Sequence, residues 1–171
     1  MRDHLLLPIF ALVIACLVLG YNIGYSFARY EGSNQWTDGV ITATFDEKTG
    51  TLTFSGEGAV YHAKDWVNVK PQLVKKMVFA DGINYVRDCE FTGGTGPISY
   101  VNLEEIVFEG DLIEIGDCAF SGNVNLKKVE FQKGCSQIGT LAFYHCLSLE
   151  DINMPDGCEY RHGDLMEDAK A

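Results

Sequence analysis

The sequence has few basic residues, and this shortage excludes one class of partner. Lysine and arginine number 13 against 24 aspartate and glutamate, so the 171-residue chain carries a net charge of −11. Nucleic-acid binding needs basic side chains that neutralise phosphates, so this charge argues against a nucleic-acid partner. Hydrophobic residues make up 47% of the chain, a share that is typical of a folded protein and not of a disordered tail.

Motifs of common enzyme classes are also missing. The chain has no G-x-S-x-G nucleophile motif, no phosphate-binding loop and no dinucleotide-binding fingerprint. It has no C-x-x-C or His-x-x-x-His spacing that would suit zinc. Asp46, Lys48 and Gly50 are spaced like part of a calcium loop, but a single acid at the alternating positions favours a plain hairpin turn. We therefore predict no enzymatic activity, no catalytic residues, no cofactor and no metal.

Charge is absent from a long stretch near the start of the chain. Residues 5–28 contain no charged residue, and about 20 apolar residues are enough for a helix to cross a membrane. Three interpretations are open. The stretch is a signal-anchor helix, or a signal peptide cleaved near Ala28, or a lipoprotein signal with Cys16 lipidated. The apolar residues after Cys16 weaken the third interpretation. Each of the three predicts export of the remaining chain.

The rest of the chain contains a repeat with a fixed period. Its units begin with Leu-x-x-Ile-x-Phe, and the leading Leu103, Leu126 and Leu149 are 23 residues apart. Three copies also share two later apolar positions. Seven residues after the phenylalanine come Val86, Ile115 and Ile138, and twelve residues after it come Phe91, Phe120 and Phe143. Such self-similarity at one period predicts a repeat architecture.

The first and last copies depart from the period. The first copy, which starts at Val74, is six residues longer because of residues 92–97, for which we expect a loop on one face. The fourth copy decays after Pro155, where Arg161 and Met166 take the places of the isoleucine and the phenylalanine. A degenerate, acidic last unit is typical of a terminal cap.

Each unit has the pattern of a short strand followed by a turn. One unit cannot bury its apolar face alone, so successive units must stack around a shared core. The segments Ile115-Gly116-Asp117-Cys118-Ala119-Phe120 and Ile138-Gly139-Thr140-Leu141-Ala142-Phe143-Tyr144-His145-Cys146 resemble the BspA-like leucine-rich repeat family of bacterial cell surfaces. The departures from its motif are Val86-Arg87 for Ile-Gly, Glu90 for Ala and Asn123 for Cys. The resemblance gives Cys146 the place of the repeat cysteine, which favours packing over a nucleophile paired with a distant histidine.

The segment before the repeats has its own signal. Residues 41–45 and 51–54 alternate with period two around a polar loop that ends in Gly50, which predicts a β-hairpin. We expect this hairpin to cover the open edge of the first repeat. The predicted fold is mainly β, a leucine-rich-repeat solenoid of about 3.5 units of 23 residues with short turns, preceded by the hairpin cap and an N-terminal hydrophobic helix. The predicted divisions are a signal-anchor or signal peptide at 1–28, a linker at 29–35, the capping segment at 36–72, the repeats at 73–154 and a degenerate C-terminal cap or tail at 155–171.

Charges at the start of each repeat strand alternate in sign. The two residues after the first apolar position of successive units are Lys75-Lys76, Glu104-Glu105, Lys127-Lys128 and Glu150-Asp151. Neighbouring strands stack about 4.8 Å apart, so each pair faces its opposite above and below. A groove for a charged ligand would carry one sign throughout. We therefore expect a structural charge ladder at these eight positions.

Four cysteines form two pairs related by the repeat. Cys89 and Cys118 each lie ten residues after the phenylalanine of their unit, and Cys135 and Cys158 occupy another equivalent position. Equivalent positions in adjacent turns lie near 5 Å apart, inside the Cα range of a disulfide. Export permits oxidation. We therefore expect either pair to be able to bridge, with buried free thiols as the alternative.

The function expected from the resemblance is an interaction module. It implies an exported, membrane-tethered leucine-rich-repeat protein of the cell surface that binds protein or glycan partners in an adhesion-like role. The chain would contact the membrane through residues 5–28 as a single-pass protein of the cell membrane, with the repeats outside. Secretion after cleavage near Ala28 is the alternative location. The alternative function is a structural stub that packs with itself or with another envelope protein.

Overall fold

The computed structural model describes residues 29–30, 34–63, 69–94 and 99–161. The hydrophobic segment expected at 5–28 lies outside these ranges, as do part of the first-copy insertion and residues 162–171 of the tail. Within the described ranges, no helix is long and apolar enough to cross a membrane.

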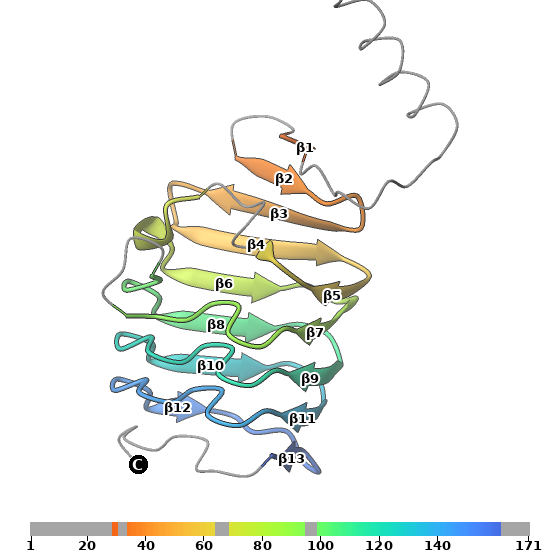
Figure 1. The fold of residues 1–171 in the computed structure, drawn as a ribbon, viewed down its shortest axis with the longest axis vertical. Coiled ribbons are helices and arrows are strands. Elements are labelled where there is room, and N and C mark those ends of the chain that lie inside the picture. Colours follow the sequence, from red (N-terminus) through yellow and green to blue (C-terminus); the bar gives the residue numbers. More distant parts are fainter. Residues whose placement is uncertain (1–28, 31–33, 64–68, 95–98, 162–171) are drawn as a thin grey trace, which may run out of the picture.

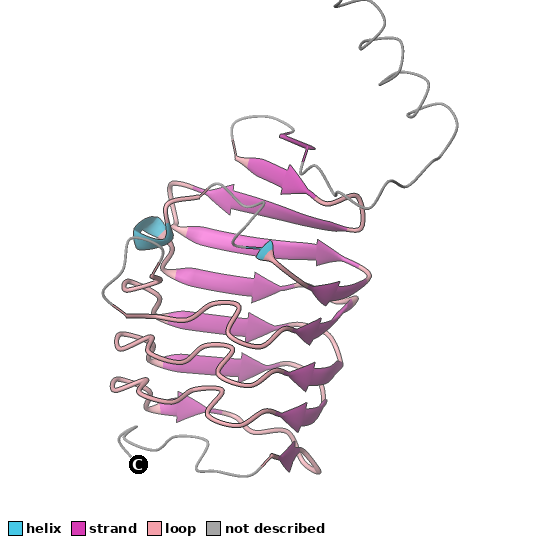
Figure 2. Cartoon of the chain, in the orientation of Figure 1, coloured by secondary structure: helices cyan, strands magenta, loops and turns pink. Residues whose placement is uncertain are grey.

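Two β-sheets run along the length of the described chain (Figure 1). The strands of the larger sheet are, in order along the sheet, β1 (Arg29–Tyr30), β2 (Gln35–Thr37), β3 (Ile41–Asp46), β4 (Thr51–Gly56), β6 (Lys76–Phe79), β8 (Glu105–Phe108), β10 (Lys128–Phe131) and β12 (Asp151–Ile152). Those of the smaller sheet are β13 (Glu159–Tyr160), β11 (Cys135–Ile138), β9 (Leu112–Ile115), β7 (Ile83–Val86) and β5 (Gly58–Val60). Strands dominate Figure 2, and η1 (Pro71–Leu73) is a single short turn of 3-10 helix. The prediction of a mainly β fold is confirmed.

Each repeat contributes one strand to each sheet, and the strands stack in parallel. In the larger sheet Phe79 of β6 pairs with Phe108 of β8, which pairs with Phe131 of β10. In the smaller sheet Val86, Ile115 and Ile138 stack in the same way. The phenylalanine and the residue seven positions later therefore end the two strands of a unit. The four copies build a β-solenoid of about four turns, where the sequence predicted a solenoid of about 3.5 units.

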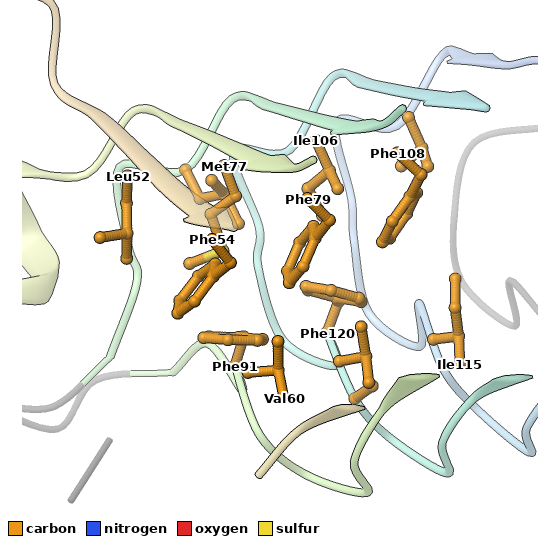
Figure 3. Close-up of a cluster of buried hydrophobic side chains, with 14 of the residues drawn as sticks. Leu52, Phe54, Val60, Met77, Phe79, Phe91, Ile106, Phe108, Ile115 and Phe120 are labelled. Atoms are coloured by element: carbon orange, nitrogen blue, oxygen red, sulfur yellow. The ribbon is translucent and has the colours of Figure 1, made fainter. Parts of the chain in front are cut away.

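The core between the two sheets is built from two columns of phenylalanines (Figure 3). Along the larger sheet, the rings of Phe54, Phe79, Phe108 and Phe131 stack with centroids 5.2, 4.9 and 5.0 Å apart. Phe91, Phe120 and Phe143 form the second column at 5.6 Å intervals. Each such contact contributes roughly 0.5–1.5 kcal/mol beyond the burial of its apolar area. The repeat spacing therefore serves to continue these columns from turn to turn.

The Ile-Gly step of the repeat has a steric cause. A Cβ on Gly116 would lie 2.5 Å from the backbone nitrogen of Asp88, and one on Gly139 would lie 2.5 Å from that of Asp117. Adjacent turns therefore approach too closely for a side chain at this position. Arg87 occupies the same place in the first copy. The preceding turn does not stack on it in the regular way, because the pairing of β5 with β7 has a register shift between Gly58 and Ala59.

The segment before the repeats is joined to them strand by strand. β3 and β4 pair antiparallel around the turn at residues 47–50. β4 then pairs in parallel with β6, so that Phe54 lies beside Phe79, and β5 pairs with β7. Residues 51–60 therefore follow the path of a repeat unit although they lack its leading leucine. β1 falls in the range expected to be a linker and pairs antiparallel with β2, whose backbone groups it satisfies.

The last turn is one residue shorter than the 23-residue turn before it. Leu112 pairs with Cys135 at a separation of 23, whereas Gln137 pairs with Glu159 at a separation of 22. The residue opposite Ile138 is therefore Tyr160, and not Arg161 as the period predicted. Strands of two residues, β12 and β13, leave little pairing to hold the exact repeat register.

Candidate functional site

The outward face of the larger sheet carries the predicted charge ladder. The pairing register places Lys76 beside Glu105, Glu105 beside Lys128, and Lys128 beside Asp151. The Nζ of Lys76 lies 3.1 Å from Oε2 of Glu105. In the neighbouring column, the Nζ of Lys127 donates to Oε2 of Glu104 at 2.7 Å. These charges are thus bonded to one another across turns.

Lys128 departs from the cross-turn pattern. Its Nζ donates at 2.6 Å to Oε2 of Glu130, two residues further along the same strand. This bond raises the pKa of Lys128 and lowers the pKa of Glu130. The hydrogen bond from Lys127 likewise lowers the pKa of Glu104. Both carboxylates are therefore fully ionised at neutral pH.

The outward face of the smaller sheet has a different composition. Two side chains per strand point outward, and they are Asn84 and Tyr85 of β7, Ile113 and Glu114 of β9, and Ser136 and Gln137 of β11. Ile113 is 60% exposed, and Tyr61, which follows β5, is 50% exposed. The rings of Tyr61 and Tyr85 lie 5.5 Å apart. We call Tyr61, Tyr85, Ile113, Glu114 and Gln137 the tyrosine face.

The polar members of the tyrosine face are held in place from the last turn. Nη2 of Arg161 lies 3.2 Å from Oε1 of Glu114 and donates to Oε1 of Gln137 at 3.2 Å. Partial burial is the main cause that raises the pKa of Tyr85, and the nearby carboxylate of Glu114 raises this pKa further. The tyrosine face therefore presents the neutral phenol of Tyr85 beside a positioned carboxylate and an amide.

An open hollow adjoins the tyrosine face at the C-terminal end of the solenoid. Its volume is about 680 Å³, and the residues that line it include Asp111, Ile113, Ser136, Gln137, Asp156 and Glu159. Asp111 uses Oδ1 to accept a hydrogen bond from the backbone N–H of Gly134 at 2.9 Å. The hollow therefore extends the surface around Ile113 with polar and acidic groups.

The sequence interpretation did not identify the tyrosine face. Its outward residues differ from turn to turn, so they leave no trace in the repeat period. Tyr61 lies in the irregular turn after β5, where the period does not apply. The tyrosine face could have been found by comparing the two residues before Val86, before Ile115 and before Ile138. These residues point outward from the second strand of each unit.

Both predicted cysteine pairs are brought into contact. The thiol of Cys118 is in hydrogen-bonding contact with that of Cys89, and Cys135 is in similar contact with Cys158. All four are free thiols in this structure. Burial raises the pKa of Cys135 to about 12.

Cys146 and Asn123 occupy the same position in successive turns, and both are fully buried. The Nδ2 of Asn123 donates to the carbonyl oxygens of Phe91 and Phe120 at 2.8 and 2.6 Å. The Sγ of Cys146 donates to the carbonyl oxygen of Phe120 at 3.4 Å. Burial raises the pKa of Cys146 to about 12, so this thiol is protonated at neutral pH and a poor nucleophile.

Other candidate sites from the sequence have local explanations. The carboxylate of Asp46 accepts hydrogen bonds from the backbone N–H of Lys48 at 2.9 Å and from the hydroxyl of Thr49 at 2.9 Å, as in a hairpin turn. Within the described part of the chain, no group of three or more histidine, cysteine or acidic side chains is arranged to hold a metal ion.

Comparison with known proteins identifies the repeat. The family model described as "BspA type Leucine rich repeat region (6 copies)" matches residues 98–165, which confirms the resemblance seen in the repeat motifs. No curated protein matches the sequence. Among solved structures, a leucine-rich repeat protein from Eubacterium ventriosum matches with 15% identity and a TM-score of 0.36. The match covers 70% of this chain and 43% of that one, so this chain spans less than half of that protein's length.

Proposed function

Because residues 98–165 are a BspA-type leucine-rich repeat region, we propose that this chain is an interaction module whose partner docks on the tyrosine face. Leucine-rich repeats generally serve protein interaction, and a solenoid offers an extended surface formed by equivalent positions of successive turns. The proposal assigns that role to the smaller sheet.

The observation that carries the proposal is the exposure of Tyr61 and Ile113 on one narrow face. Large apolar side chains that cluster at a surface mark interaction sites, and tyrosine is enriched at the centres of protein interfaces. Among the described side chains of the larger sheet's strands, no large hydrophobic residue is exposed. Five of the ladder charges of that sheet are in ion pairs, which favours the smaller sheet as the docking face.

The chemistry of the tyrosine face fits a protein or glycan partner. A tyrosine pair offers flat apolar area, and Glu114 and Gln137 offer hydrogen-bond acceptors and donors beside it. The chain's net charge of −11 argues against a nucleic-acid partner.

We further propose that the module acts at the cell surface, in an adhesion-like role, with the repeats outside the cell. The uncharged residues 5–28 support a single-pass anchor in the cell membrane. Secretion after cleavage near Ala28 is the alternative. N-terminal sequencing of the mature protein from a membrane fraction tests this point: an intact terminus in the membrane supports the anchor, and a terminus at residue 29 in the medium overturns it.

The docking proposal is tested with the full chain in detergent. Wild type and two double variants are compared for binding to a panel of purified extracellular-matrix proteins and to a glycan array. Tyr61→Ala with Tyr85→Ala removes the rings of the tyrosine face. Lys76→Ala with Glu105→Ala is the matched control, because it removes a bonded pair from the larger sheet and leaves no charge of that pair unpaired.

We expect the tyrosine variant to lose about tenfold or more in affinity for any ligand that wild type binds, and the control to retain it within about twofold. The reverse result would overturn the proposal. Absence of binding by wild type, combined with self-association in sedimentation, would instead support the structural stub that packs with itself.

A further inference from the structure

Cys89 and Cys118 lie side by side in the first two turns of the solenoid. The backbone N–H of Cys89 donates to the carbonyl oxygen of Asp117 at 2.8 Å, which aligns Cys89 with the residue after Asp117. The preceding strands share that register, since Tyr85 pairs with Glu114. Both cysteines have left-handed backbones, with φ of 53° and 54°. Their side chains therefore leave equivalent turns in equivalent directions.

The separation of the two cysteines suits a disulfide. Equivalent residues of stacked strands lie about 4.8 Å apart, and a disulfide accepts Cα separations of about 4.4–6.8 Å. Cys89 is exposed and Cys118 is half-buried, so a reagent in solution reaches the pair through Cys89.

The second cysteine pair is less favourably placed. The two thiols touch, but the last turn is one residue shorter, and Cys158 lies before β13 and outside the residues that pair with β11. Cys135 is buried, with 5% of its surface exposed. The two pairs, equal in the sequence, therefore differ in both alignment and access.

We propose that Cys89 and Cys118 are a redox site, at which a small-molecule or protein disulfide oxidises the two thiols to a disulfide that links the first two turns. The thiolate of Cys89 attacks one sulfur of the incoming disulfide, which releases one thiolate and leaves a mixed disulfide on Cys89. The thiolate of Cys118 then attacks the sulfur of Cys89 and releases the second thiolate. The two cysteine protons pass to the released thiolates, so the incoming disulfide is reduced to two thiols.

The bridge would close a loop that contains the insertion of the first unit. Residues 90–117 lie between the two cysteines, and they include the insertion at 92–97. A cross-link of this kind restricts the unfolded chain and so favours the folded state. The redox site therefore ties together the turns at which the repeat is least regular, independently of what binds to the tyrosine face.

The surroundings of Cys118 give the second step a pH dependence. Burial, the neighbouring thiol of Cys89 and the carboxylates of Asp117 and Asp88 all raise the pKa of Cys118. Its thiolate fraction therefore grows as pH rises toward that pKa, and ring closure accelerates. At lower pH the mixed disulfide on Cys89 accumulates instead.

The test uses the full chain in detergent, exposed to oxidised glutathione over time. Samples are quenched with acid, free thiols are alkylated, and the peptides are mapped by mass spectrometry. We expect the peptide that joins Cys89 to Cys118 to form at least about tenfold faster than any other cross-link. Its rate should rise between pH 7 and pH 9, and Cys118→Ser should stop at glutathionylated Cys89.

Cys158→Ser is the matched control, because it breaks the other pair and should leave the Cys89–Cys118 rate unchanged. A Cys135–Cys158 peptide that forms first, or cross-links scattered among all cysteines, would overturn the proposal. As a second readout, oxidised wild type should unfold at a higher denaturant concentration than its reduced form, and Cys118→Ser should show no such shift. An equal shift in Cys118→Ser would also contradict the proposal.

Discussion

On the larger sheet Lys76 bonds to Glu105 and Lys127 to Glu104, whereas on the smaller sheet Tyr61 and Ile113 remain half exposed or more. Both faces are built on the same turns and cover the same core. The larger sheet uses outward charges to attach the first three repeat turns to one another. The smaller sheet has an ion pair from Glu114 to Arg161 and otherwise leaves aromatic and aliphatic groups in contact with water. The comparison separates a face that stabilises the stack from one that is available to a partner.

The first prediction concerns the core that both faces share. Phe120→Ala removes a fully buried ring between the two phenylalanine neighbours Phe91 and Phe143, and should lower the free energy of unfolding by about 3–5 kcal/mol. Denaturant unfolding measures the change, and hydrogen exchange should show both sheets losing protection together. Val40→Ala, at a residue that is 65% exposed, is the control and should change little. Loss of protection in one sheet alone would contradict a shared core.

The strands of the middle turns could be predicted because the core repeats with them. Leu103, Leu126 and Leu149 are all buried, so the period of the sequence is the period of the packing. The sequence predicted a hairpin at the edge of the first repeat, but not that β4 pairs in parallel with β6 in the register of the repeat, because Gly50 precedes it and no leucine marks its start. The spacing of Leu52 and Phe54, which equals that of Met77 and Phe79, was the signal available.

The candidate site could not be predicted in the same way. Outward positions of the smaller sheet do not pack against an equivalent neighbour in the core, so they are free to differ in each turn. The one-residue change of register in the last turn could not be predicted from the sequence either. Strands of two residues have few hydrogen bonds, so local geometry decides whether Tyr160 or Arg161 pairs with Ile138. The pairing of the strands, and not the period of the repeat, brings the residues of the tyrosine face together.

The second prediction sharpens the contrast with a charge reversal. Glu105→Lys would stack three lysines at positions 76, 105 and 128 of the larger sheet, and should cost about 1 kcal/mol of stability. Ser136→Lys places the same charge on the exposed face of the smaller sheet and should stay within about 0.5 kcal/mol of wild type. Urea unfolding of the two variants side by side gives the answer. Equal losses would mean that the larger sheet gains nothing from its ladder.

The third prediction separates the two faces by pH. Hydrogen bonds from Lys127 and Lys128 lower the pKa of Glu104 and Glu130 below their ordinary 4.5, so their stabilising contribution is present above pH 4.5 and is lost as pH falls through the folded values. Burial raises the pKa of Tyr85 above its ordinary 10, so its contribution is present below pH 10 and is lost as pH rises further.

Thermal unfolding between pH 3 and pH 11 gives a curve of stability against pH, with an acid limb for the carboxylates and an alkaline limb for Tyr85. Lys127→Met with Lys128→Met should flatten the acid limb and leave the alkaline limb unchanged. Tyr85→Phe should do the opposite. A variant that altered the limb assigned to the other face would contradict the separation.

The smallest expected effect on stability is that of Tyr61→Ala. The side chain is half exposed, and its loss should change the free energy of unfolding by no more than about 0.5 kcal/mol. Binding to a partner found on the panel should nevertheless fall. Denaturant unfolding and affinity measured on the same preparation check both halves. A large loss of stability would assign Tyr61 to the fold instead of the docking surface.

The most direct test of the docking face is hydroxyl-radical footprinting of the full chain with and without a partner from the panel. Oxidation of Tyr61, Tyr85 and Ile113 is compared with that of Val40 and Leu73, two exposed residues outside the tyrosine face. We predict that a saturating partner lowers oxidation of the first three severalfold and leaves the other two unchanged. Protection of Val40 and Leu73, with Tyr61, Tyr85 and Ile113 still fully reactive, would contradict the proposal that the smaller sheet binds the partner.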